Sequence, residues 1–354
     1  MRTIFRAFLM LGIFACVALF GAMQYLDTWS KTAIPVSSEI VVDLKQGMPL
    51  RSLASELSSK GLVDGKTIFV VWMRLQSDYS KLQAGSYIFK GKISPAEIHS
   101  KMLKGDVYIP IALQVTIPEG FTLKMLNERL AAKNVGSPKD LSNLVRDQKF
   151  IKSLGVNSSS LEGYTYPATY SFQTLPNASE FYQKIVNTFF EKLPPEYASD
   201  IAKRGLNLTQ AVTFASLIEL ETMREEEKPL ISEVIWSRLK RGEPLGIDAA
   251  IIYGIANYDG DLKWKDLKNA KNKYNTRIHR GLPPSPIGAA SMSSLVAVLN
   301  PSKLGYYYYV LDSADPTRHV FSKTLDEHNR NVRKFLKSGG IPTMRRSHEQ
   351  EGTH

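Results

Sequence analysis

The sequence predicts an α+β protein with an N-terminal transmembrane helix, a small mixed subdomain and a larger mixed domain of helices and short strands. Three observations support this prediction. An uncharged apolar run lies near the N-terminus, and extended apolar runs near residues 40 and 306 are typical of strands. Between them lie many segments with apolar residues at helical spacing. At 354 residues, the chain has room for two or three domains beyond a membrane segment.

The first element is an apolar helix. The chain begins with Arg2 and Arg6 and carries no charge over residues 7–26, which we assign to a single transmembrane helix. Because positive charge precedes the span, we expect residues 1–6 in the cytoplasm and the rest of the chain outside it. A cleavable signal peptide is the alternative, although Gly21-Ala22-Met23 is only a weak cleavage site.

A linker is expected over residues 27–38, followed by a subdomain over residues 39–107 with the order β-α-α-β-α. Its third helix has clear ends, because Ser94 is a plausible N-cap before Pro95 and Gly105 stops the helix. The strands are expected at 40–42 and 84–89, and the first two helices at 49–60 and 67–76.

The larger domain is expected over residues 108–337, with a disordered polar tail over residues 338–354. An aromatic loop containing Gly and Pro occupies residues 161–170. Strands are expected at 115–117 and 306–311, with a short helix or strand at 251–255. Helices are expected at 123–133, 138–148, 178–191, 196–204, 209–221, 227–241 and 325–336.

Composition limits the classes of function. The net charge of +11 favours anionic neighbours, such as lipid headgroups or a wall polymer, although solvated surface lysines explain most of it. No zinc-finger or RNP-like motif accompanies the basic residues, so nucleic acid is not an expected partner. Cys16 is the only cysteine, and the six histidines form no HExxH motif. We therefore expect no disulfide, no metal and no cofactor.

The helix expected after an N-cap at Thr209 places a carboxylate at the end of an apolar stripe. Phe214, Leu217, Ile218 and Glu221 lie at i, i+3, i+4 and i+7, so they share one face. Apolar surroundings favour the neutral, proton-donating form of a carboxyl group, which a general acid needs near neutral pH. We therefore predict that Glu221 is the general acid.

Two alternatives remain for this helix. An acidic residue at a helix end is more often simply solvated, and Arg224 at i+3 could pair with Glu221 and keep it ionised. Glu219 lies about 200° around the helix, so the two glutamates cannot act as a pair from one face.

Three further segments, 245–254, 274–287 and 319–329, suggest a polar cleft near Glu221. The proline-rich part of the second is stiff, and its Tyr and Asn residues suit sugar recognition, although a purely structural connection is an equal alternative. Asp248 could be a second carboxylate, but we favour an N-cap for the segment that follows it.

The run ASLIELET, followed by LGIDAAIIYG, YNTR, GLPPSPIG, YYYYV, HVFS and EHN, resembles the MltG/YceG-like family of endolytic murein transglycosylases. Upstream, AGSYIF, VTIPEG and LEGYTYPATY match the family in the same order, so the resemblance covers about residues 39–336. It implies a bacterial inner-membrane enzyme with a periplasmic LysM-like subdomain and a catalytic domain. The enzyme would cleave nascent peptidoglycan between N-acetylmuramic acid and N-acetylglucosamine, which could end strand elongation.

The family motif E-x-E-T, with its second glutamate catalytic, assigns that role to Glu221. Two departures put substrate contacts in doubt: Ala168 replaces a usual Asp, and residues 245–250 keep only Asp248 of the usual polar set.

We expect peptidoglycan and the membrane as partners, and peptidoglycan synthases as candidates. Alternatives are a hydrolase, with Asp248 or Glu162 activating water, and a non-catalytic wall-binding scaffold. The predicted substrate-binding residues are Glu162, Tyr164, Asp248, Tyr253, Tyr274, Asn275, His319 and Asn329.

Overall fold

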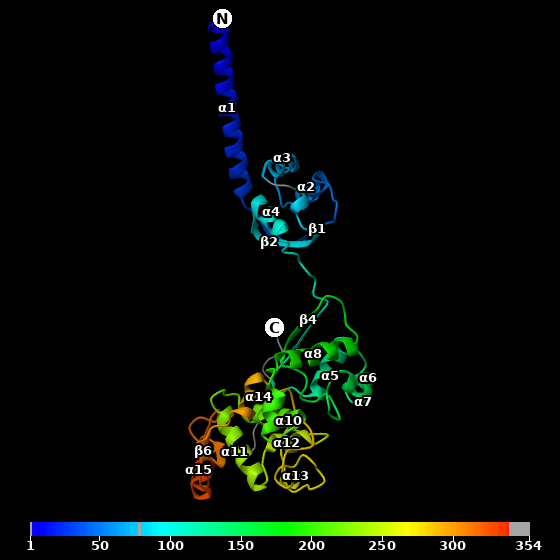
Figure 1. Ribbon diagram of the computed structural model, residues 1–354, viewed down its shortest axis with the longest axis vertical. Coiled ribbons are helices and arrows are strands. Elements are labelled where there is room, and N and C mark those ends of the chain that lie inside the picture. The colour runs from blue at the N-terminus through cyan, green and yellow to red at the C-terminus, as the bar shows by residue number, and fades with distance from the viewer. Residues whose placement is uncertain (1, 77–78, 340–354) are drawn as a thin grey trace. The chain divides into compact units, whose positions relative to one another are not determined.

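The computed structural model describes residues 2–76 and 79–339, and the chain divides into two compact units, Met1–Pro110 and Ile111–His354. The expected disordered tail lies almost entirely outside the described residues. Both units combine helices with small antiparallel sheets, so the structure is of the mixed α+β type (Figure 1).

The first unit contains one long helix and a small β-α-α-β-α arrangement, the order that the sequence predicts. Its elements are α1 (Arg2–Lys31), β1 (Ile34–Leu44), α2 (Leu50–Ser59), α3 (Lys66–Gln76), the single turn η1 (Tyr79–Lys81), β2 (Gly85–Ile93) and α4 (Pro95–Lys104). β1 and β2 pair antiparallel, with Val42 opposite Tyr87. The Ser94 hydroxyl accepts a hydrogen bond from the amide of Glu97, and Gly105 has the left-handed φ of 68° that ends α4, as expected.

The expected linker over residues 27–38 is not present. α1 continues to Lys31 and β1 begins at Ile34, which leaves two residues between them. The end of the helix is stabilised by packing, because the rings of Trp29 and Trp72 meet edge-on with centroids 6.3 Å apart. Residues Leu9–Lys31 form a helix long and apolar enough to cross a membrane, and its most apolar 18-residue window has a mean hydropathy of 2.0.

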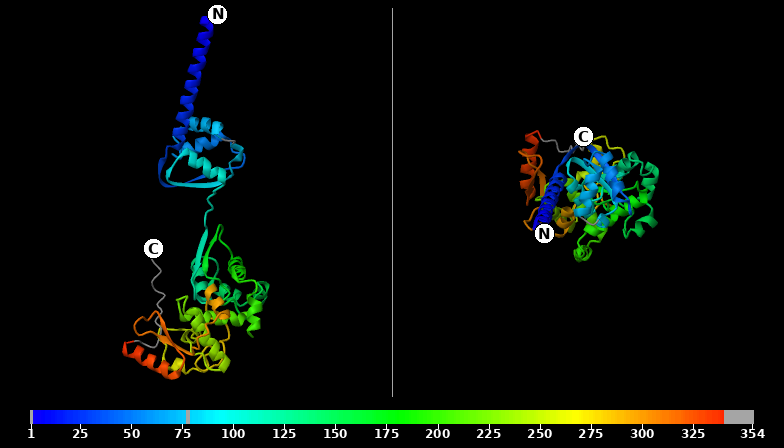
Figure 2. Two further views of the ribbon diagram at one scale, coloured as in Figure 1. Left: turned by 60° about the vertical axis from the view of Figure 1, so that its left-hand side comes forward. Right: turned by 90° about the horizontal axis from the view of Figure 1, so that it is seen from above.

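In the second unit, α10 (Leu208–Glu221) packs against the helices α9, α11, α12 and α14 (Figure 1), and Figure 2 shows the same unit from two other directions. Two small antiparallel sheets flank them, β3 paired with β4 and β5 paired with β6. The strands are β3 (Leu113–Ile117), β4 (Ala168–Phe172), β5 (Tyr308–Leu311) and β6 (His319–Ser322). The helices are α5 (Leu123–Ala132), α6 (Pro138–Leu144), α7 (Gln148–Ser153), α8 (Ala178–Lys192), α9 (Tyr197–Lys203), α10 (Leu208–Glu221), α11 (Lys228–Arg241), α12 (Asp248–Tyr253), α13 (Trp264–Leu267), α14 (Met292–Leu299) and α15 (Leu325–Lys337).

Several boundaries differ from the sequence-based expectation. The helix expected at 138–148 is divided into α6 and α7, because the Asp147 carboxylate caps a new helix by accepting from Lys149 and Phe150. β4 and α14 lie in segments to which the sequence assigned no element. Of the segment at 251–255, left open between helix and strand, residues 251–253 form the end of α12 and the last two residues lie beyond it.

α10 differs from the prediction in two ways that matter for the site. Its N-cap is Asn207, which forms a capping box with Gln210, rather than Thr209. Neighbouring elements bury α10 on nearly all sides, and Glu219 and Glu221 are each only 5% exposed. An apolar stripe therefore cannot distinguish the two glutamates, because both helix faces are covered.

Candidate active site

Glu221 is the last residue of α10 and is buried against the β5–β6 hairpin. Its partner there is Tyr309 of β5. Burial raises the pKa of the Tyr309 hydroxyl well above its usual range, and the charge of Glu221 and a side-chain hydrogen bond to it raise that pKa further. The hydroxyl therefore stays protonated and is held beside the Glu221 carboxyl group as a donor.

A second carboxylate fixes the hairpin to the turn that follows α10. Glu227 accepts a 2.8 Å hydrogen bond from the Thr222 hydroxyl. It also accepts 2.8 Å and 2.7 Å hydrogen bonds from the backbone N and Nδ1 of His319 on β6. The His319 ring lies edge-on to the Tyr309 ring, with centroids 5.3 Å apart. Glu227 thus aligns both aromatic side chains with Thr222, the residue directly after Glu221.

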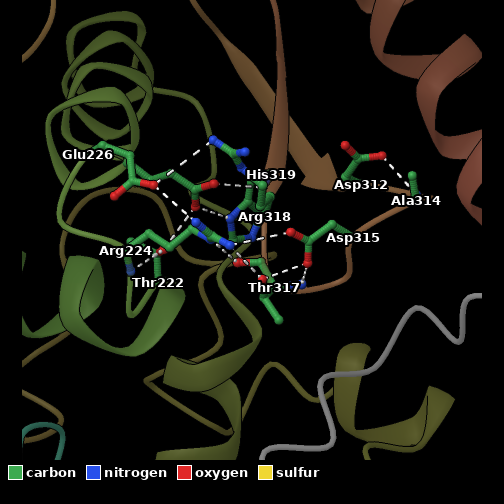
Figure 3. A network of polar contacts seen from close by, with 10 residues as sticks. Thr222, Arg224, Glu226, Asp312, Ala314, Asp315, Thr317, Arg318 and His319 are labelled. Atoms are coloured by element: carbon green, nitrogen blue, oxygen red, sulfur yellow. Dashed lines mark hydrogen bonds and ion pairs between the residues drawn. The ribbon is translucent and has the colours of Figure 1, made fainter.

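Arg224 links the same turn to the tip of the hairpin (Figure 3). Its Nε donates to the Thr317 carbonyl at 3.1 Å, and its Nη2 bonds the Thr317 hydroxyl at 2.9 Å and Asp315 at 3.3 Å. Nη1 also pairs with Glu226 at 3.1 Å. The sequence could not reveal these partners, because Asp315 and Thr317 are about 90 residues away in the chain.

Glu219 belongs to a different network. Its Oε2 accepts from the Ser291 backbone at 2.7 Å, and its Oε1 lies 3.4 Å from the buried ammonium of Lys228. Burial, assisted by the nearby charge of Glu219, raises the pKa of Glu119. Glu219 is thus bonded at the start of α14 and to Lys228, whereas Glu221 meets Tyr309, so the two glutamates have different partners.

Asp248 lies near the Glu221 end of the site. It is the first residue of α12 but provides no side-chain cap, so the favoured N-cap interpretation is wrong. Its carboxylate instead pairs with Arg277 at 2.8 Å. Burial raises the pKa of Asp248, Arg277 opposes that rise, and the charge of Asp248 contributes to the raised pKa of Tyr309.

Glu162, Tyr253 and Tyr274 meet in a cavity of about 860 Å³ that Glu221 does not line. The Glu162 carboxylate accepts from the Tyr253 hydroxyl at 2.8 Å and from the Leu123 amide at 3.0 Å. Burial raises the pKa of Glu162 to about 7, against the lowering effect of these hydrogen bonds. The Tyr253 and Tyr274 rings are 4.9 Å apart at their centroids.

Two predicted binding residues have structural roles instead. Tyr164 is 1% exposed, packs on Phe189 and hydrogen-bonds the Thr209 hydroxyl at 2.7 Å. Asn275 is fully buried, and its side-chain nitrogen donates to three backbone carbonyls in the 266–269 segment. Side chains so enclosed cannot contact a sugar in this conformation, so we remove both from the predicted binding set.

The last two predicted residues lie on the hairpin side of the unit. The His319 ring is occupied by Glu227, as described above. Asn329 lies exposed on α15.

Within the described ranges, no group of three or more His, Cys, Asp or Glu side chains is arranged to hold a metal ion.

In this arrangement the buried carboxyl group of Glu221 has a hydroxyl donor beside it, while the neighbouring Glu227 is held by Thr222 and His319, and a carboxyl group so placed suits proton transfer to and from a substrate oxygen. Residues 42–334 match the model of the YceG-like family, so the chain belongs to that family.

Two named proteins and one solved structure are similar to this chain along most of its length. The chain is 28% identical over 311 residues to the endolytic murein transglycosylase of Bacillus subtilis, covering 84% of this chain and 85% of the relative. It is 25% identical to the Streptococcus pneumoniae enzyme of the same name over 93% of this chain, and it spans 64% of that longer protein. The crystal structure of a YceG-like protein from Listeria monocytogenes superposes with a TM-score of 0.58 at 28% identity, over 82% of this chain and 98% of the other.

Proposed function

We propose that this protein is an endolytic peptidoglycan lytic transglycosylase with Glu221 as its general acid and base. The observation that carries the proposal is the placement of Glu221. It is the second glutamate of the E-x-E-T sequence, it ends the buried helix α10, and Tyr309 supplies a hydroxyl beside it. The names of the Bacillus and Streptococcus relatives support the reaction class.

The reaction needs one carboxyl group because the nucleophile belongs to the substrate. Protonated Glu221 donates its proton to the glycosidic oxygen while the bond from C1 of N-acetylmuramic acid breaks, and N-acetylglucosamine leaves as the alcohol. The Glu221 carboxylate then removes the proton of the C6 hydroxyl, and O6 bonds to C1 to form a 1,6-anhydro end. Glu221 is protonated again at the end, and no water is consumed.

Asp248 and Tyr309 complete the proposed site. The charge of Asp248 acts on Tyr309, the partner of Glu221, and its carboxylate is paired with Arg277 at 2.8 Å. A carboxylate stabilises the positive charge of an oxocarbenium-like transition state. Asp248 is also the group that would activate water if the enzyme were a hydrolase.

The N-terminal unit fits an anchored wall enzyme. The apolar stretch Leu9–Lys31, preceded by Arg2 and Arg6, supports a single-pass anchor in the bacterial inner membrane with the rest of the chain in the periplasm. The β1-α2-α3-β2 order with an antiparallel pair supports a LysM-like subdomain for the first unit. Such an anchor would keep the enzyme near nascent glycan at the membrane, where cleavage would end strand elongation and peptidoglycan synthases are candidate partners.

The test is digestion of purified glycan strands by the full chain in detergent, with mass analysis of the products. We expect internal cuts that yield 1,6-anhydro-N-acetylmuramic acid ends. Reducing ends, 18 mass units heavier by one added water, would identify a hydrolase and refute the transglycosylase. Glycan binding without any cleavage would identify a scaffold.

A further inference from the structure

The cavity lined by Glu162, here called the Glu162 cavity, is not lined by Glu221 and has no role in the reaction proposed above. Its volume of about 860 Å³ lies within the range of about 300–1,000 Å³ typical of ligand sites. It is formed by the start of α5, by α6, by residues 159–162, by the end of α12 and by residues 271–274. Every one of these segments belongs to the second unit.

The rim of the cavity is basic. Lys124, Arg146, Lys271 and Lys273 line it and are exposed, and among the residues that the structure describes none of them forms an ion pair, although the charge of Arg146 acts on Glu162. Two carboxyl groups, those of Glu128 and Glu162, also line it. The oxygens of Glu162 are already engaged by Leu123 and Tyr253. Unpaired cations around a hollow attract an anionic ligand.

The inner wall adds apolar and hydrogen-bonding surface. The Tyr253 and Tyr274 rings line it beside the Ser285 hydroxyl, to which Tyr274 is hydrogen-bonded at 2.7 Å. Flat rings and small polar groups below a cationic rim suit a short peptide that carries carboxylates. A glycan strand without its peptides keeps only one carboxylate per muramic acid, on the lactyl group, so it would gain less from four cations.

Helix α12 connects the cavity to the proposed active site. Asp248, whose charge acts on Tyr309, begins α12, and Tyr253, which lines the cavity, ends it. Six helical residues span about 9 Å. The muramic acid of peptidoglycan carries its stem peptide on the sugar ring itself, so the peptide of a sugar bound beside Asp248 could extend along α12 toward the cavity.

We propose that the Glu162 cavity binds the carboxylate-bearing stem peptide of the glycan strand whose sugar occupies the site at Glu221. This inference rests on the proposed function. It makes the enzyme selective for strands that retain their peptides, with the basic rim supplying the selectivity.

The test compares two substrates: glycan strands with stem peptides, and the same strands after an amidase has removed the peptides. For the full chain in detergent, we expect kcat/KM to be about ten-fold higher on the peptide-bearing strands, mainly through a lower KM. In the double variant Lys271→Ala/Lys273→Ala, this ratio should fall toward one. The control Lys265→Ala/Lys268→Ala removes the same charge from exposed lysines outside the cavity, and it should keep the parent ratio.

Equal kcat/KM on the two substrates in the parent would overturn the inference, as would a ratio lowered equally by both double variants. A parent that cleaves neither substrate would refute the proposed function instead. In that case, a calorimetric titration of the full chain with free stem peptide tests peptide binding to the cavity separately. Saturable binding that is lost in the Lys271→Ala/Lys273→Ala variant would support the cavity as a peptide site. No binding would refute it.

Discussion

The Tyr253 hydroxyl at the end of α12 donates a 2.8 Å hydrogen bond to Oε2 of Glu162, 91 residues earlier in the chain. The same carboxylate accepts from the Leu123 amide at the start of α5. One buried acidic side chain therefore joins three segments that form the cavity. Because it is enclosed, the protonation of Glu162 is coupled to the stability of this region.

Replacing Glu162 should change how stability depends on pH. Burial raises the folded-state pKa of Glu162 from 4.5 to about 7, so between these values the folded state binds more protons than the unfolded state. The contribution of Glu162 to the free energy of unfolding is therefore fully present below pH 4.5 and declines as pH rises through 7, by at most about 3 kcal/mol. Thermal unfolding of parent and Glu162→Gln proteins in detergent should show the parent losing stability relative to the variant between pH 5 and pH 8. A constant difference between the two would contradict this linkage.

Removing the carboxyl group of Glu221 should stop the chemistry and keep the fold. The variant Glu221→Gln retains the size of the side chain, and the loss of general acid–base assistance alone should lower kcat by about 10²–10⁴-fold. Release of anhydro products measures the effect, with circular dichroism as a check on folding. Glu191→Gln, an exposed glutamate on α8, is the matched control and should cleave like the parent. Substantial cleavage by Glu221→Gln would refute the assignment.

The hydroxyl of Tyr309 should matter beyond the packing of its ring. Tyr309→Phe keeps the ring against His319 and removes the donor beside Glu221. A hydrogen bond to a charged group contributes about 1.5–3 kcal/mol, so kcat should fall about 10–100-fold. Tyr307→Phe, on the same segment, keeps its ring over Arg241 and serves as the control. If both variants lost activity equally, Tyr309 would have only a structural role.

Arg224 should act on activity more than on stability. The guanidinium is partly exposed, so its ion pairs contribute at most about 1 kcal/mol. It nevertheless holds the hairpin tip that positions Tyr309 and His319 (Figure 3). We expect Arg224→Ala to lower kcat several-fold while shifting the melting temperature little. Lys203→Ala, which breaks the exposed pair with Asp200, should change neither quantity. A kcat unchanged in Arg224→Ala would show that the hairpin does not need this tie.

Gly163, next to Glu162, should tolerate no side chain. At φ 82° it is in the left-handed region, and a Cβ there would lie 2.4 Å from Pro286 and 2.7 Å from Val212. Gly155 has a similar φ of 74° with open space around it. Alanine should therefore cost about 1 kcal/mol of unfolding free energy at Gly155, and about 1–3 kcal/mol more at Gly163. Thermal unfolding of the two variants separates backbone strain from the steric clash, and equal losses would contradict the clash.

Elements with strong local signals were predictable. The capping sequence at Ser94 and the glycine at Gly105 mark both ends of α4, because these signals act within one helical turn. Other boundaries were missed where two local signals compete. The sequence suggested Thr209 as the N-cap of α10, but the helix begins one residue earlier with Asn207 as its cap, and the Thr209 hydroxyl bonds Tyr164 instead.

Glu221 was predictable as a candidate, but the reason for its choice over Glu219 was incomplete. Hydrophobic periodicity assumes one covered face, whereas α10 is covered on nearly all sides. The distinction comes from long-range partners: Ser291 and Lys228 bind Glu219, and Tyr309 meets Glu221. No local pattern encodes such pairings.

By itself, the sequence determined the apolar N-terminal helix, the order of most elements and the membership of the YceG-like family, while proton transfer by Glu221 stays a prediction. These depend on composition, short-range backbone preferences and ordered runs of residues. Only the tertiary structure decided that Tyr164 and Asn275 are enclosed, that Asp248 pairs with Arg277, and that Glu162 and Tyr253 share a cavity. The reason is physical: burial and hydrogen-bond partners depend on segments that meet only after the chain has packed.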